Sequence, residues 1–137
     1  MDNEYVIVKV ILNSEYVQMK VFVYWNLTKG IWSVKALQGN QKGLVISHAT
    51  NIKLTNCEFK VSEKQRQYVI KNKRKVVHAG VVGYLSLLEF AQEQVSIRVT
   101  YNPYRFSSFV NKNNHEEKIF KASFVEMKSN REVIAYM

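Results

Sequence analysis

Two histidines have surroundings that suit acid–base chemistry. His48 and His78 both lie in apolar stretches and are both followed by alanine, in the sequences ISHAT and VVHAG. Two imidazoles can cleave RNA without a metal, because one removes the proton of the 2′-hydroxyl while the other protonates the leaving oxygen. Lys60 or Lys75 would stabilise the charged phosphorane, and Tyr101 would supply a further donor. This pairing requires both rings within about 7 Å in an open cleft; otherwise each is a hydrogen-bonded strand residue.

A second candidate site is the segment from residue 60 to residue 75, where only Glu63 opposes the positive charges. Its seven cations are Lys60, Lys64, Arg66, Lys71, Lys73, Arg74 and Lys75. On a helix they ring the axis, but the last four converge in the final turn and the exit. This convergence predicts contacts with phosphates. The alternative is a solvated helix whose cations compensate its own dipole.

Aromatic side chains near cations would allow bases to stack. Trp25 lies near Lys29, and Tyr104 precedes Arg105. Both aromatics stand at strand ends beside polar turn residues, so we expect Trp25 and Tyr104 to be exposed, with Arg105 as a further contact. Trp32, between apolar neighbours, is expected in the core.

A large positive net charge is the most informative property of the whole chain. Its 20 Lys and Arg outnumber 11 Asp and Glu, giving +9 and a pI near 9.7. Such an excess favours anionic partners through a long-range, salt-sensitive field. Nucleic acid, with RNA preferred, is the first expectation, and an acidic host protein or nucleoprotein complex is the second.

The sequence motifs of several other classes of protein are absent. The single Cys57 forms no CxxC pair or Cys/His cluster, so we expect no metal and no cofactor. The sequence contains no P-loop, HExxH or GxSxG motif. Its longest apolar run, 76–88, is too short and too broken to span a bilayer, and the first residues do not form a signal peptide. We expect a soluble cytoplasmic protein without membrane contact.

The elements that must position these residues are mostly strands. Alternating or β-branched stretches predict strands at 5–12, 16–24, 31–37, 44–49, 57–61, 76–88, 95–101, 107–110, 119–127 and 133–136. Ser62 and Gln65 form a capping box that begins a helix over about 63–72. His115 is expected in a turn. The chain is therefore predicted to be one α+β domain, residues 1–137, dominated by antiparallel sheet with one helix.

The join between helix and strand matters for chemistry. If 76–88 is a regular central strand, Lys75 and His78 lie on opposite sides of the pleat, and only a twist or bulge would let them share a ligand. This reduces the case for catalysis and favours binding.

Five stretches resemble a family of small proteins from tailed bacteriophages, over about residues 25–110. These stretches are NLTKGIWSV, GLVISHATNIKL, CEFKVSEKQRQYVI, KNKRKVVHAGVVG and TYNPYRFSSFV. The matching polar positions are His48, Lys60, Arg66, Lys75 and His78. The family pattern has imidazole where this chain has Trp25 or Thr28, and asparagine at Val76.

The resemblance implies a viral protein acting in the infected bacterium's cytoplasm, in host takeover or counter-defence. It implies no enzyme class. Our first hypothesis is a small basic protein that binds RNA or a nucleic-acid-containing host complex. The alternatives are a metal-independent ribonuclease or related transferase that uses the two histidines, and an inhibitor directed at a host protein.

Overall fold

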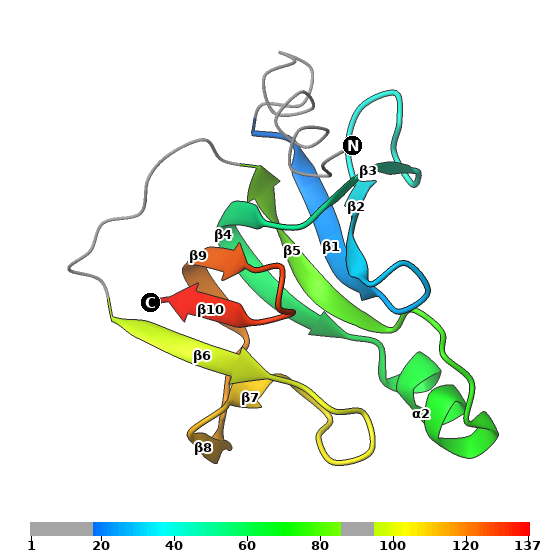
Figure 1. Cartoon of the computed structure of the whole chain (residues 1–137), viewed down its shortest axis with the longest axis vertical. Coiled ribbons are helices and arrows are strands. Elements are labelled where there is room, and N and C mark those ends of the chain that lie inside the picture. The colour runs from blue at the N-terminus through cyan, green and yellow to red at the C-terminus, as the bar shows by residue number, and fades with distance from the viewer. Residues whose placement is uncertain (1–17, 86–94) are drawn as a thin grey trace.

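The computed structural model describes residues 18–85 and 95–137. The strand expected at 5–12, the turn after it and residues 86–88 of another expected strand lie outside these ranges. Within them one antiparallel sheet dominates (Figure 1), which confirms the α+β, mainly β prediction. The strands are β1 Lys20–Asn26, β2 Ile31–Ala36, β3 Val45–Ala49, β4 Ile52–Val61, β5 Ala79–Leu85, β6 Ser96–Thr100, β7 Val110–Asn111, β8 Asn114–Lys118, β9 Lys121–Met127 and β10 Val133–Tyr136.

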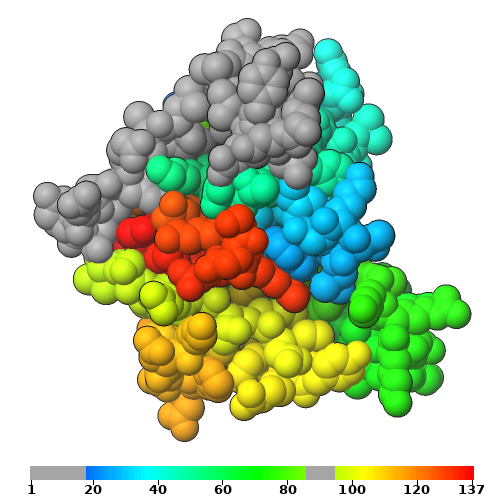
Figure 2. Space-filling view, in the orientation of Figure 1, coloured from blue at the N-terminus to red at the C-terminus, as the bar shows by residue number. Residues whose placement is uncertain are grey.

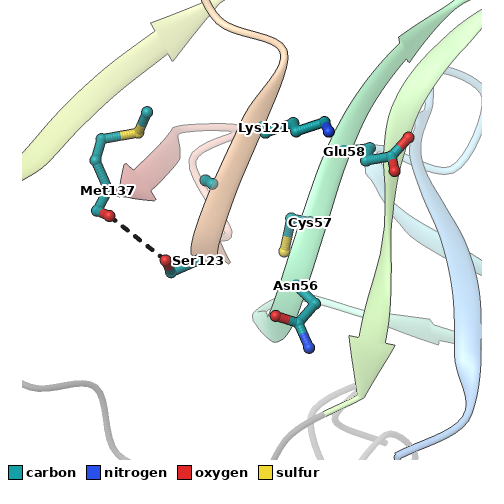
Figure 3. Close-up of a pocket in the computed structure, with 7 residues that line it drawn as sticks. Asn56, Cys57, Glu58, Lys121, Ser123 and Met137 are labelled. Atoms are coloured by element: carbon teal, nitrogen blue, oxygen red, sulfur yellow. Dashed lines mark hydrogen bonds between the residues drawn. The ribbon is translucent and has the colours of Figure 1, made fainter.

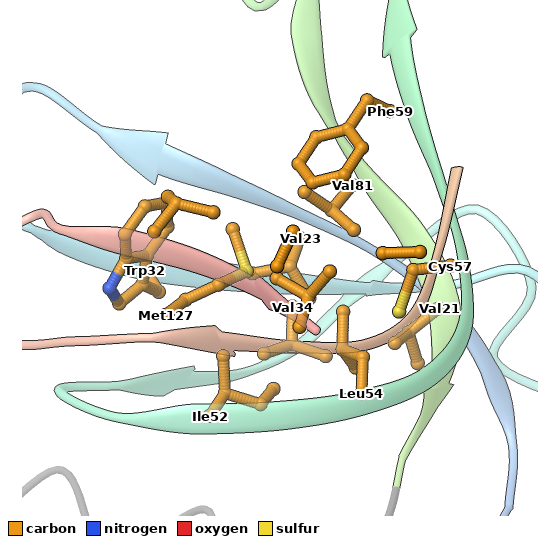
Figure 4. Packing of buried hydrophobic residues seen from close by; sticks show 14 of the residues in the cluster. Val21, Val23, Trp32, Val34, Ile52, Leu54, Cys57, Phe59, Val81 and Met127 are labelled. Atoms are coloured by element: carbon orange, nitrogen blue, oxygen red, sulfur yellow. The ribbon is translucent and has the colours of Figure 1, made fainter. Parts of the chain in front are cut away.

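The ten strands follow the order β3-β2-β1-β5-β4-β9-β10-β6-β7-β8. Alternation explains why they bury one face: in β1, Val21 and Val23 are fully buried while the residues between them are partly exposed. The sheet curls around these inward residues, as Figure 4 shows. The indole N–H of Trp32 in β2 donates to the carbonyl of Lys128 after β9, at 2.8 Å. Trp32 is therefore buried, as expected, and ties distant parts of the curl together.

Two local features shape the centre of the sheet. In β4 the register shifts between Thr55 and Glu58, where Asn56 has φ 49°, and this bulge bends the longest strand. In β5, a Cβ on Gly80 would collide with the carbonyl of Val23 and the Phe22 ring. Glycine at this position allows β1 and β5 to approach closely.

The one helix of the described residues, α2 (Glu63–Asn72), is inserted into the connection between β4 and β5. Val61 and Ala79 pair across the two strands, and the Ser62 N–H donates to the His78 carbonyl at 2.7 Å. We call residues 62–78, which leave the sheet and return to it at this point, the β4–β5 connection. Figures 1 and 2 show α2 projecting beyond the ends of the strands.

The predicted helix and its start are confirmed, but only one of the two hydrogen bonds of the expected capping box forms. The Ser62 hydroxyl accepts from the Gln65 N–H. The reverse bond from the Gln65 side chain does not form, because the Ser62 N–H already donates to the His78 carbonyl.

Other expectations need correction. Residues 76–78 precede β5 and pair with no strand, although β5 is central as expected. β4 begins at Ile52, five residues before the expected start. His115 lies in β8 and not in a turn; this short exposed edge strand is so polar that composition hides it.

Candidate functional site

The end of α2 gathers four exposed cations. Lys71, Lys73, Arg74 and Lys75 are exposed, and we call these four residues the basic helix end. Lys64, in the first turn, is exposed as well. Within residues 18–85 and 95–137, none of these five forms an ion pair with a carboxylate. Their charge therefore faces solvent.

Two other predicted cations are engaged within the protein. Lys60 lies 2.7 Å from Glu58. Arg66 lies 2.8 Å from Glu63, and its Nε donates to the Pro103 carbonyl at 2.9 Å. With its side chain only 13% exposed, Arg66 attaches α2 to the loop between β6 and β7. Its contacts make it a structural clamp.

The clamp places the loop 101–109 beside α2 (Figure 1). Tyr104 in this loop is 60% exposed, as expected. The guanidinium of Arg105 lies 5.3 Å from the centre of the Phe106 ring, which orients it. The loop thus adds an exposed aromatic ring and a cation next to the helix.

A pocket of about 390 Å³ opens on the other side of the connection, between the β1–β2 turn and the segment leaving α2. We call it the Tyr24–Lys75 pocket. It is lined by Tyr24, Trp25, Asn26, Leu27, Thr28, Lys75, Val76 and Val77. The structure therefore brings together Trp25 and Lys75, which are 50 residues apart in the sequence and were predicted separately as contacts.

Trp25 is half-buried, less exposed than expected. Its ring meets Trp32 edge-on at 5.0 Å, and the Arg131 guanidinium lies 5.6 Å from its centre. The ring is therefore held in a fixed orientation. Thr28 and Val76 line the pocket together with Trp25.

Sequence reasoning missed the apolar part of the pocket. Leu27 is 50% exposed and Val77 is 52% exposed. Val76 and Val77 look like the first residues of a buried strand because valine favours strands. Their exposure arises because the chain joins the sheet only at Ala79.

The structure brings His78 and Tyr101 together. His78 Nε2 lies 2.8 Å from the Tyr101 hydroxyl, and Nδ1 lies 3.0 Å from the Val76 carbonyl. The carbonyl can only accept, so Nδ1 carries the proton and Nε2 of the neutral ring accepts from Tyr101. Tyr101 also stacks on Phe109, and burial raises the pKa of its hydroxyl to about 12. This network fixes the base of the β4–β5 connection.

His48 lies elsewhere on the sheet. It sits in β3 opposite Ser33, and β2 and β1 separate β3 from β5. At about 4.8 Å per strand, three strand spacings place His48 roughly 14 Å from the β5 chain. Burial and the charge of Lys29 lower the pKa of His48. The two imidazoles are therefore not brought together, and each has its own structural surroundings.

A second depression, of about 450 Å³, lies where the β4 bulge meets β9 and the last residue (Figure 3). Cys57, Lys121 and Ser123 are among its lining residues, and the Ser123 hydroxyl donates to the Met137 carbonyl. Burial raises the pKa of the Cys57 thiol to about 12. A thiol of this kind is a poor nucleophile at neutral pH.

The described part of the chain contains neither a metal-binding cluster nor a membrane-spanning helix. No group of three or more His, Cys, Asp or Glu side chains there could hold a metal ion. No helix in those residues is long and apolar enough to cross a membrane.

The chain resembles known phage proteins. The family model described as Mycobacterium phage L5 gene 82 protein matches residues 15–135. The Gene 82 protein of Mycobacterium phage L5 is 40% identical over 101 residues, which cover 69% of this chain and 79% of that protein. No solved structure matches the chain significantly.

Proposed function

The chain belongs to the Mycobacterium phage L5 gene 82 protein family, and we propose that it is a small basic protein that binds RNA or a nucleic-acid-containing complex of the infected bacterium. Such a protein would act in host takeover or counter-defence. The observation that carries the proposal is the basic helix end, whose four exposed cations form no ion pair with an acid in residues 18–85 and 95–137.

Charge is concentrated in the projecting segment. The β4–β5 connection holds six cations and one acid, so 17 residues carry +5 of the net +9. A compact group of exposed cations attracts a polyanion and releases its condensed counterions on contact. A helix that only compensated its own dipole would need basic residues in its last turn. Here Lys73, Arg74 and Lys75 follow the helix and extend the charge beyond that need.

Aromatic rings near the β4–β5 connection support nucleic acid as the anion. Tyr104 is exposed and follows Pro103, which Arg66 of α2 contacts, and Tyr24 lines the pocket that Lys75 also lines. Bases stack on such rings, which adds to the affinity that phosphate contacts provide. RNA is favoured because its loops and ends present unstacked bases.

Salt-dependent binding tests the proposal. Labelled single- and double-stranded RNA and DNA would be titrated with the full chain by fluorescence anisotropy at about 50 mM and about 300 mM salt. We expect binding at the lower concentration and a steep loss of affinity at the higher one. No binding to any of the four nucleic acids at either salt would overturn the proposal.

Two controls separate it from the alternatives. RNA that is cleaved in EDTA while DNA stays intact would favour the ribonuclease hypothesis, since only RNA has a 2′-hydroxyl. A host protein retained by the chain from nuclease-treated lysate, in the absence of nucleic-acid binding, would favour the inhibitor hypothesis.

A further inference from the structure

We infer that the Tyr24–Lys75 pocket holds one unpaired nucleotide of a single strand, with the base against the aromatic wall and the phosphate at Lys75. The inference rests on the proposed function and specifies its ligand. It assigns the pocket a role distinct from that of the basic helix end, which contacts backbone phosphates.

The aromatic wall suits a flat base. Successive side chains of a strand face opposite ways, and Trp25 packs against the core beside Trp32 and Arg131. The ring that faces away from this core, at the end of β1 beside the pocket, is that of Tyr24. Stacking on such a ring contributes about 1–3 kcal/mol per base. The exposed side chains of Leu27 and Val77 extend the apolar surface that a base would cover.

The charges at the rim suit a phosphate. Lys75 lines the pocket, and it continues the run from Lys73 and Arg74. A nucleotide matches both the apolar interior and the cationic rim. Inorganic phosphate would leave the apolar walls exposed, and a wholly apolar ligand would leave Lys75 without a partner.

The volume of the pocket, and the way a base can reach it, both favour an unpaired nucleotide over a base-paired one. The volume of about 390 Å³ lies within the range of roughly 300–1,000 Å³ that small-molecule pockets occupy. A base inside a duplex has both faces stacked and its edge paired, so it reaches a pocket only after it leaves the stack. The pocket therefore favours single strands, whereas the basic helix end alone would bind either form.

The test compares single-stranded RNA with a hairpin duplex of equal charge, using wild type, Tyr24→Leu and Phe120→Leu. Phe120→Leu is the matched control because it removes another exposed aromatic ring, located between β8 and β9. We expect wild type to prefer the single strand. Tyr24→Leu should lower single-strand affinity about 10-fold, the loss of one stacked base, with duplex affinity unchanged. Phe120→Leu should change neither.

A second variant and a second ligand test the pocket independently of Tyr24→Leu. Val77→Glu places a charge at an exposed position of the pocket and should reproduce the loss even if Tyr24→Leu folds poorly. In amide NMR spectra, uridine monophosphate should shift Thr28 and Lys75 more than inorganic phosphate does. Equal binding of both RNAs with both pocket variants unaffected would overturn this inference and leave the proposed function standing. No binding of either RNA by wild type would overturn the proposed function itself.

Discussion

The curled sheet and the β4–β5 connection differ in how many of their charged side chains are paired. On the sheet, Lys60 lies 2.7 Å from Glu58, and Arg98 lies 4.0 Å from Glu132, which precedes β10. In the connection, Glu63 is the single acid and its partner is Arg66, which also holds the helix in place. The difference indicates that the core of the sheet supplies stability while the exposed cations of the connection present charge, so that core substitutions and cation-to-glutamine substitutions should separate the two properties.

The largest expected effect tests the sheet. Leu54→Ala removes a fully buried side chain at the centre of the core, and we expect a loss of about 3 kcal/mol in the free energy of unfolding. Chemical denaturation measures it. RNA affinity of the folded protein should remain that of wild type, because Leu54 lies away from both cations and pocket. A large loss of affinity in folded protein would break the division between the two regions.

The next effect tests the base of the connection. His78→Ala leaves the Tyr101 hydroxyl and the Val76 carbonyl without their partner, and we expect a loss of about 2 kcal/mol in unfolding free energy. His115→Ala, in the exposed edge strand β8, is the matched control and should stay within about 0.5 kcal/mol. If His78→Ala instead left stability unchanged and abolished an RNA cleavage activity, the ribonuclease hypothesis would replace this interpretation.

A smaller effect separates stability from binding at one residue. Lys73 ends α2 with φ 53°, a left-handed conformation that glycine adopts without steric cost. Lys73→Gly should stabilise the fold by about 0.5 kcal/mol and still weaken RNA binding, because one cation is lost. Lys71→Gly removes the same charge inside the helix and should destabilise it by about 1 kcal/mol. Stability changes of the same sign in both variants, measured by thermal unfolding, would contradict this account of the helix end.

The smallest effect concerns pH. Burial and Lys29 hold the pKa of His48 below its ordinary 6.5. As the pH falls below 6.5, the unfolded chain therefore binds a proton before the folded protein does, and stability decreases through that range. Lys29→Gln should raise the pKa of His48, although burial keeps it below the ordinary value. If an NMR titration gave the His48 imidazole the same pKa in both proteins, the charge of Lys29 would not act on His48, which would contradict this account.

Local patterns in the sequence predicted the parts of this comparison that depend on neighbouring residues. The Ser62 cap, the helix to Asn72 and most strands follow from residues close in the chain. Contacts between segments that are far apart in the sequence could not be predicted from such local patterns. Trp25 and Lys75 line one pocket only through the pairing of β1 with β5, and Arg66 contacts Pro103 only through the curl of the sheet.

The valines show the limit most clearly. Val76 and Val77 have the composition of a buried strand, yet they are exposed beside the pocket. Hydrophobicity predicts where a side chain is stable when it is covered. It does not say whether the chain's own fold or a ligand covers it.

The most direct measurement of the central claim compares two triple variants that remove the same charge. Lys71, Lys73 and Arg74 are changed to glutamine in one, and the exposed Lys42, Lys112 and Lys118 of the turns and edge of the sheet in the other. If the basic helix end is the contact, the first variant alone should lose RNA affinity, with its log–log salt slope reduced by about 2, or roughly 0.7 per phosphate contact. Its unfolding free energy should match that of wild type. Equal losses in both variants would show that net charge alone governs binding, and would contradict the assignment of the site to the β4–β5 connection.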